Sequence, residues 1–189
     1  MSTDSPARPY HHGHLRGALL DAARATIDEQ GPAGVSLRDL ARRAGVSHAA
    51  PTHHFGDKRG LMTALAAEGF RALADRLADA PADDMVGLGL AYVEVATSRR
   101  ADFAVMFRPD LLDADDTALR AAQQAAWDAL LSGVAALPPS ARPGGDLLAA
   151  RSAWSFAHGF ATLWNAGAMP HDGGSATDVA GPMLRQHFG

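Results

Sequence analysis

Side chains that suit contact with nucleic acid gather in one stretch of the sequence, between Ser36 and Phe55. Helix starts are expected at Ser36 and Ser47, and the backbone N–H groups freed at both helix N-termini, with these two hydroxyls, suit phosphate oxygens. Small residues after Ser47 allow close approach to base edges and contact with thymine methyls. The residues of this kind are Ala49 and Ala50, with hydrogen-bonding groups at His48, Thr52, His53 and His54.

The histidines also suggest an alternative, a metal site. His11, His12 and His14 lie close together, and His53 and His54 are adjacent. Neighbouring residues on a helix point about 100° apart, so adjacent histidines do not easily share one ion. The chain has no H-x-x-x-H or H-E-x-x-H spacing, which is the spacing that zinc sites on helices use. We therefore expect no metal.

Catalytic patterns are missing from the sequence. There is no G-x-S-x-G motif and no glycine-rich phosphate loop, and the chain has no cysteine to act as a nucleophile or to form a disulfide. We predict that the protein is not an enzyme and needs no cofactor.

The elements that position these side chains are all expected to be helices, because apolar residues recur at three and four positions and no strand pattern appears. In the first part, helices are predicted over residues 14–29, 36–44, 47–55 and 57–80. Ser36 with Asp39 is expected to form a capping box, Ser47 to cap the short third helix, and Asp57 to cap the fourth.

The rest of the chain reads as five more helices, which makes about nine in an all-α fold. They are expected to start at Asp83 or Asp84, at Asp102, at Asp115, at Asp146 and at Ser175. Within the first part, a capped helix, a turn at Gly45 and a short second helix form a helix-turn-helix, whose second helix presents its N-terminal half to a major groove.

Composition and charge set the limits of these expectations. The chain has 189 residues, 47% hydrophobic and 20% charged, as in an ordinary globular protein. Its net charge is −4, but residues 1–60 hold eight Lys and Arg against six Asp and Glu, together with six of the nine histidines. No stretch approaches a membrane span or a signal peptide. We expect a cytoplasmic protein with a flexible tail over residues 1–9, a DNA-binding domain over 10–56 and a helical ligand-binding and dimerisation domain over 57–189.

The run SLRDLARRAGVSHAAPTHHFGDKRGLM resembles the signature of the TetR family of transcriptional regulators, and YHHGHLRGALLDAA upstream is similar to the first helix of that family. The resemblance covers roughly residues 10–70. It implies that Lys58 holds a phosphate and that Phe55 is a core residue fixing the recognition helix. With these, the residues expected to bind DNA are Ser36, Arg38, Ser47, His48, Ala49, Ala50, Thr52, His53, His54 and Lys58.

Two positions depart from the family pattern. Thr52 stands where the family usually has a tyrosine, and its shorter side chain weakens one expected backbone contact. Pro51, placed at the fourth helical position after the Ser47 cap, would remove one early helix hydrogen bond.

Downstream, SAWSFAHGFATLWNAG resembles the penultimate helix of a TetR subgroup with a Trp-His-Gly signature, here Trp154, His158 and Gly159. That resemblance implies a homodimer whose penultimate helix contributes to the interface and to a ligand cavity. A dimer would place two recognition helices in successive major grooves of a palindromic double-stranded operator. The TetR resemblance implies repression that a small-molecule effector relieves. The effector is expected to be lipophilic, because few acidic residues lie near the aromatic and methionine side chains. The residues expected to line its cavity are Phe103, Met106, Phe107, Trp127, Trp154, His158 and Trp164.

Two alternatives stay open at this point. The aromatic residues can equally be ordinary core packing. A helix-turn-helix also occurs as a purely structural motif, so an all-helical metal- or ligand-binding protein without a DNA role is the second interpretation.

Overall fold

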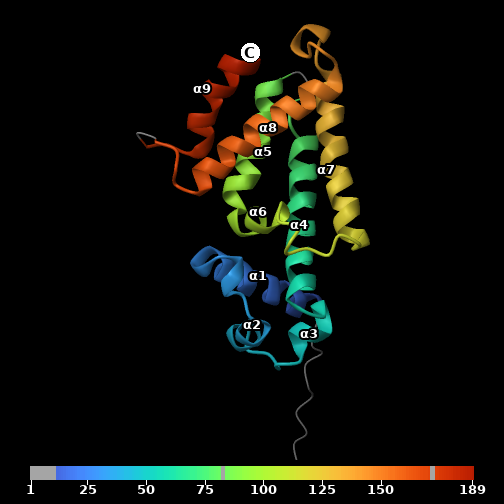
Figure 1. Ribbon diagram of the computed structural model, residues 1–189, viewed down its shortest axis with the longest axis vertical. Coiled ribbons are helices and arrows are strands. Elements are labelled where there is room, and N and C mark those ends of the chain that lie inside the picture. The colour runs from blue at the N-terminus through green and yellow to red at the C-terminus, as the bar shows by residue number, and fades with distance from the viewer. Residues whose placement is uncertain (1–11, 82–83, 171–172) are drawn as a thin grey trace, which may run out of the picture. The chain divides into compact units, whose positions relative to one another are not determined.

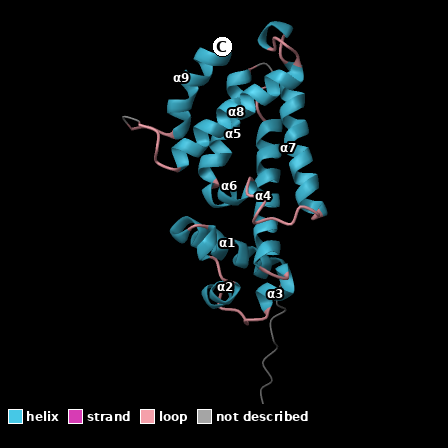
Figure 2. Cartoon of the chain, viewed as in Figure 1, coloured by secondary structure: helices cyan, strands magenta, loops and turns pink. Residues whose placement is uncertain are grey.

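The computed structural model describes residues 12–81, 84–170 and 173–189, with the backbone alone for 12–14. These residues form helices joined by loops, without strands (Figures 1 and 2). The predicted tail and the His11, His12 and His14 cluster lie outside the residues whose side chains are described. In the described part the α-helices are α1 (His12–Gln30), α2 (Leu37–Arg43), α3 (Ala50–Phe55), α4 (Lys58–Ala78), α5 (Met85–Ser98), α6 (Arg100–Met106), α7 (Thr117–Ala136), α8 (Asp146–Asn165) and α9 (Ala176–Phe188).

The chain divides into two compact units between Leu61 and Met62, inside the first turns of α4. The first unit therefore holds α1, α2, α3 and the start of α4. The second holds the rest of α4 and the helices after it. The sequence placed the corresponding division between residues 56 and 57.

The first unit has a small aliphatic core. Leu19 and Ile27 of α1 lie on one stripe, Leu40 of α2 faces the same interior, and Leu61 is fully buried. Helix α1 ends at Gln30, and Gly31, with φ of 73°, turns the chain into a single 3₁₀ turn at Pro32–Gly34. This core fixes the short helices α2 and α3, which are too short to be stable alone.

Several of the predicted helix starts are confirmed. Asp84 accepts a hydrogen bond from Val86 N and caps α5 as predicted. The cap of α7 is Asp116, which accepts from Leu119 N, one residue after the predicted Asp115. Ser175 forms a complete capping box with Asp178 at the start of α9. Each cap satisfies a backbone N–H that the helix cannot satisfy itself.

The predicted side-chain caps at Ser36 and Asp102 are wrong. Ser36 is the N-cap residue of α2, but its side chain makes no capping hydrogen bond, and Asp39 pairs with Arg42 at 3.3 Å. Asp102 does not begin α6, which starts two residues earlier. It lies buried inside that helix, 2.8 Å from Arg99 Nε, and the ion pair offsets the cost of burying the carboxylate.

Helix α5 is the central element of the second unit and packs against α8 and α9. Most of its residues are apolar and buried, among them Val93 and Ala91. At Gly89 the helices approach so closely that a Cβ atom would lie 2.6 Å from the Leu184 side chain of α9. Over the described helices, no segment is long and apolar enough to cross a membrane.

Candidate functional site

The turn between α2 and α3 has the geometry of a helix-turn-helix. Gly45 adopts φ of 66°, in the left-handed region, and directly follows the C-cap residue Ala44. The next amide, Val46 N, returns to Ala41 O at 3.0 Å. This bond closes the end of α2 in the manner of a Schellman motif, which favours glycine at the left-handed position. The predicted role of Gly45 is confirmed.

Helix α3 begins later than the sequence predicted. Its N-cap is Ala49, and Ser47 lies in the preceding turn, where its carbonyl accepts from Ala50 N at 3.0 Å. The prediction that Ser47 caps this helix is therefore wrong. The reason lies with Pro51, which falls in the first turn of α3, where a missing N–H costs nothing. Pro51 is also buried, so it packs rather than distorts.

The ten residues predicted to bind DNA all lie in the first unit, in the segment from α2 to the start of α4. Six side chains are exposed and four are half-buried. The exposed ones are therefore available to a partner without any rearrangement. They are Arg38, Ser47, His48, Ala49, Thr52 and His53, and the half-buried ones are Ser36, Ala50, His54 and Lys58.

Lys58 opens α4 and also holds the loop before α2. Its Nζ donates to the carbonyl of Ala33 at 2.9 Å, which uses one of the three ammonium protons. Asp57, just before it, accepts from Gly60 N at 2.8 Å and caps α4 as predicted. Phe55 is half-buried at the end of α3, with the Arg16 guanidinium 5.5 Å from its ring centre.

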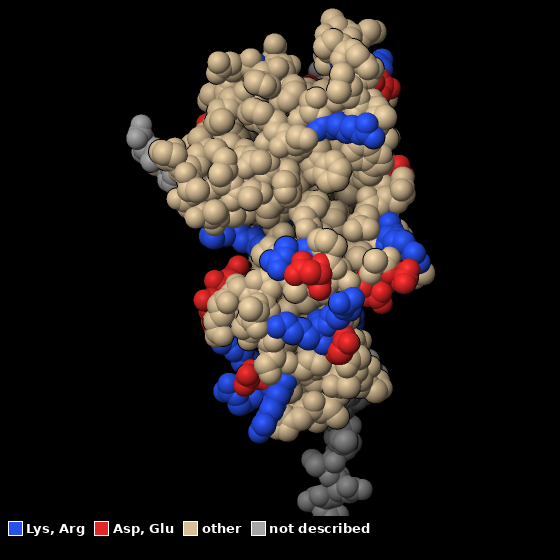
Figure 3. Space-filling view, viewed as in Figure 1, with Lys and Arg blue, Asp and Glu red and all other residues tan. Residues whose placement is uncertain are grey.

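Arginines of the first unit divide between structural and exposed positions. Arg43 forms a two-bonded fork with Glu29, at 3.1 and 2.7 Å, which lowers the pKa of the Glu29 carboxyl and ties the end of α2 to the end of α1. Arg42 has 71% of its side chain exposed and pairs only weakly with Asp39. The sequence analysis did not select Arg42, although its exposed position on α2 adds a cation beside Arg38. On the face drawn in Figure 3, Lys and Arg side chains lie among acidic ones over this unit.

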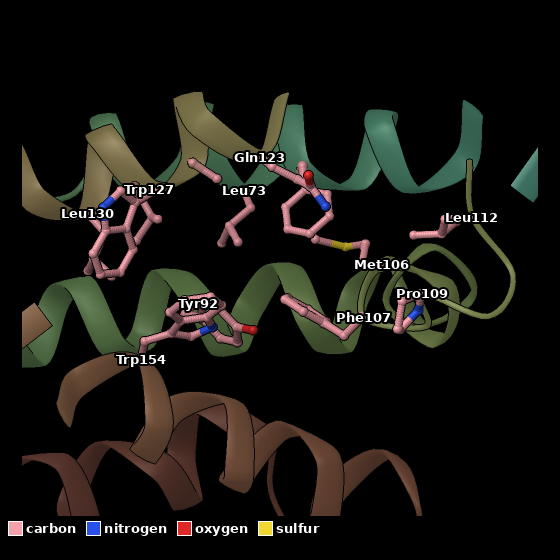
Figure 4. A pocket seen from close by; sticks show the side chains of 13 residues that line it. Leu73, Tyr92, Met106, Phe107, Pro109, Leu112, Gln123, Trp127, Leu130 and Trp154 are labelled. Atoms are coloured by element: carbon pink, nitrogen blue, oxygen red, sulfur yellow. The ribbon is translucent and has the colours of Figure 1, made fainter. Parts of the chain in front are cut away.

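The second unit contains an apolar cavity of about 300 Å³ (Figure 4). This volume is at the lower end of the range for small-molecule pockets. In Figure 4, Trp127 and Leu130 lie toward one end and Leu112 toward the other. The side chains around it come from α4, α5, α6, α7, α8 and the loop after α6: Phe70, Leu73, Leu77, Tyr92, Met106, Phe107, Pro109, Leu112, Gln123, Ala126, Trp127, Leu130 and Trp154.

Four of the seven residues predicted for a ligand cavity line this one: Met106, Phe107, Trp127 and Trp154. Phe103 and His158 lie behind Phe107, with ring centres 5.6 and 4.6 Å from it. Trp164 is not among the lining residues. It stacks on Phe160, with ring centres 5.9 Å apart.

Tyr92 joins the cavity wall to His158. Its hydroxyl lies 2.8 Å from His158 Nδ1. Burial raises the pKa of the Tyr92 phenol. Burial also lowers the pKa of His158 below its ordinary value, so the imidazole is neutral at pH 7.

The sequence analysis missed several lining residues, notably Phe70, Tyr92 and Gln123. Phe70 and Tyr92 stand at core-face positions of amphipathic helices, where apolar spacing does not separate a packed site from a cavity. Gln123 is exposed and polar, as most glutamines are, so nothing in its sequence context points to a cavity.

Large apolar side chains are exposed on α8 and α9. The exposed fractions reach 56% at Leu148 and 48% at Leu163. The face drawn in Figure 3 also carries few charged side chains over the second unit. The exposed residues of this set are Leu147, Leu148, Trp154, Leu163 and Met183.

Two family models match the chain. The one described as bacterial regulatory proteins, tetR family, matches residues 19–65, and the one described as tetracyclin repressor-like, C-terminal domain, matches residues 85–186. The first match covers the helix-turn-helix segment, and the second covers most of the helices around the cavity.

Curated relatives are similar mainly in the N-terminal part. The HTH-type transcriptional regulator BetI of Paraburkholderia xenovorans is 47% identical over 49 residues, which make up 26% of this chain and 25% of that protein. BetI of Rhizobium meliloti is 35% identical over 100 residues, 52% of this chain and 47% of that protein. The chain thus matches between a quarter and a half of the length of these relatives.

Solved structures are similar over nearly the whole chain. A protein of unknown function from Rhodococcus sp. RHA1 is 34% identical, with a TM-score of 0.72 over 95% of this chain and 96% of that one. The fatty acid degradation regulator FadR from Bacillus halodurans, 15% identical, has a TM-score of 0.69 over 98% and 97%. At 15% identity, the similarity to FadR shows a shared fold and says nothing of function.

Proposed function

We propose, from the premise that this chain belongs to the TetR family of DNA-binding transcriptional regulators, that it represses transcription as a homodimer and leaves its operator when a small apolar effector binds. The observation that carries the proposal is the α2–turn–α3 segment, with its left-handed Gly45 and the exposed His48, Thr52 and His53.

In this proposal α3 enters a major groove. His48 and His53 reach base edges, because imidazoles both donate and accept hydrogen bonds. Thr52 reaches less far than the tyrosine usual in the family. The Lys58 ammonium donates one proton to the Ala33 carbonyl, and it binds a phosphate with its remaining protons. Arg42, exposed on α2, adds a second cation.

The homodimer is proposed to form through α8 and α9. Their exposed leucines, with Met183, make an apolar surface that a monomer would leave in water. Two copies related by a two-fold axis would build a four-helix interface and present two α3 helices to a palindrome, about 34–36 Å apart. The Trp154, His158 and Gly159 pattern supports assignment to the Trp-His-Gly subgroup.

The effector is proposed to occupy the cavity of the second unit. Five aromatic rings and several aliphatic side chains line it, and none of the described lining residues carries a formal charge. An ion would lose its hydration there without compensation, whereas a neutral, largely apolar molecule would gain from burial.

The test of DNA binding starts with the purified full chain and a pool of random double-stranded DNA. The selected sequences are expected to be palindromic, and affinity for them is expected to fall steeply with salt. Lys58→Ala should weaken binding to all sequences and reduce the salt slope by about 1. The matched control is Arg120→Ala, which removes an exposed cation of α7 and should leave both unchanged.

The same measurement separates the alternative interpretation. A helical ligand-binding protein without a DNA role would select no common sequence from the pool. Light scattering at micromolar concentration tests the assembly independently, because a monomer mass would contradict both the α8–α9 interface and the palindrome.

A further inference from the structure

Two hydrogen-bonded side chains, Tyr92 and His158, run from the cavity wall into the protein. Trp154 and Tyr92 line the cavity side by side (Figure 4), whereas His158 does not line it. The Tyr92 oxygen is 2.8 Å from His158 Nδ1. The hydroxyl is therefore the point at which an apolar cavity meets a polar chain.

The direction of this hydrogen bond follows from the groups involved. Tyr92 has one proton, and the neutral His158 ring offers Nδ1 as its acceptor. The opposite tautomer would use the phenol oxygen, a weaker acceptor than the imidazole nitrogen, and would turn the tyrosine proton toward apolar side chains, which costs an unmade hydrogen bond. His158 therefore carries its proton on Nε2.

This arrangement leaves the Tyr92 oxygen able to accept a hydrogen bond, because its proton is donated to His158 and a hydroxyl also has acceptor sites. We infer that Tyr92 is the specificity-determining residue of the cavity, and that the effector is a compact, uncharged, apolar molecule carrying a hydrogen-bond donor such as a hydroxyl group. The inference rests on the proposed effector role of this cavity.

The other polar lining group does not compete for this role. Gln123 is exposed on α7, so water already satisfies its amide. Tyr92 is only 5% exposed, so a donor that reaches its oxygen replaces no strong contact with solvent. An acceptor-only molecule would set oxygen against oxygen at this point and lose affinity.

His158 acts through Tyr92 as a positioning residue. By accepting the tyrosine proton it fixes the hydroxyl as an acceptor toward the cavity. Without that acceptor the Tyr92 proton would be free to turn toward the ligand, and the cavity would then accept a ketone as well as an alcohol.

Menthol and menthone test the inference, because they have nearly the same shape and only menthol has a donor. Calorimetric titration of the full chain should show menthol binding about fivefold more tightly, the contribution of one hydrogen bond. In Tyr92→Phe, menthol should weaken to the level of menthone while menthone stays unchanged. If Tyr92→Phe keeps the preference, the inference is wrong.

A pair of His158 variants separates positioning from packing. His158→Gln, whose amide oxygen can accept the tyrosine proton, should keep the preference for menthol. His158→Leu should remove it, by raising the affinity for menthone rather than by lowering that for menthol. If His158→Leu weakens both compounds to the same degree, His158 only packs against its neighbours and its positioning role is refuted.

The remaining outcomes distinguish this inference from the proposed function. If the two compounds bind the wild-type chain equally well, the cavity still takes apolar molecules but Tyr92 does not select them. If neither binds, the effector cavity and the inference both fail, while the DNA measurements with Lys58→Ala stand by themselves.

Discussion

The two units of the chain build their candidate sites in opposite ways. In the first, one continuous segment from residue 36 to residue 58 supplies every candidate DNA contact. In the second, residues from Phe70 to Trp154, on five helices and one loop, surround the cavity. A surface made by one segment depends on local rules for caps and turns. A cavity made by five helices depends on how well their side chains fill the space between them.

The largest expected effect comes from breaking the core of the first unit alone. Leu40→Ala removes a fully buried side chain and should cost about 2–5 kcal/mol of unfolding free energy. All three tryptophans lie in the second unit. In a denaturant titration, helical circular dichroism should therefore report a shifted transition, and tryptophan emission a smaller shift.

Leu37→Ala is the control, because Leu37 lies on the same helix and is only half-buried. Its effect should be clearly smaller. Equal shifts of both signals in Leu40→Ala would show that the two units unfold together. The two units would then not differ in stability.

The next effect concerns the cavity. Ala126 lines it and is buried, so Ala126→Phe should fill the space and weaken menthol binding at least tenfold, or about 1.4 kcal/mol. DNA affinity without ligand should stay unchanged. Ala125→Phe places the same ring on the exposed side of α7 and should change neither. Weakened DNA binding in Ala126→Phe would mean that the two sites cannot be separated by this substitution.

A smaller effect is expected at the turn of the first unit. Gly45 has a positive φ but open space around an added Cβ atom, so Gly45→Ala tests backbone strain without a clash. The left-handed conformation should cost about 1–2 kcal/mol. Gly17→Ala, inside α1 and also without a neighbouring atom, should stabilise by up to about 1 kcal/mol. Denaturation midpoints that move in the same direction for both variants would contradict this account.

The smallest effect is the pH dependence at His158. Its pKa in the folded chain lies below the ordinary 6.5 because burial disfavours the imidazolium. On acidification, the unfolded chain therefore takes up the proton at a higher pH than the folded chain. The contribution of His158 to the unfolding free energy is fully present above the ordinary pKa of 6.5, and it is lost as the pH falls from there through the lower pKa of the folded chain. Between pH of about 7.5 and 5.5, wild-type protein should lose more unfolding free energy than His158→Gln. An equal loss would mean that the ring is solvated.

The helices were largely predictable from the sequence because their signals are local. Asp84 and Ser175 cap helices where the pattern placed them, Asp116 caps α7 one residue after the predicted Asp115, and Gly45 turns the chain as expected. The predicted side-chain caps failed at Ser36, which makes no capping hydrogen bond, and at Ser47, which precedes the N-cap residue Ala49 of α3. A local rule identifies residue types that can cap a helix, but it does not decide whether the side chain adopts the capping conformation.

The cavity was predictable only in part. Aromatic residues marked the region, but the same spacing placed Trp164 there, and that ring stacks on Phe160 instead. Tyr92 looked like one more core residue of an apolar helix. Its polar role depends on His158, 66 residues away in the chain, and such a pairing is a product of tertiary packing.

Pro51 has a consequence for association rates and entropy. Its ring fixes one backbone angle in the first turn of α3, and burial holds the ring in place. A flexible reading helix would have to give up conformational entropy on meeting its partner, and that loss is subtracted from affinity. Here much of the ordering has already taken place during folding. The helix meets its partner in a single shape, and less of the contact energy is spent on creating that shape.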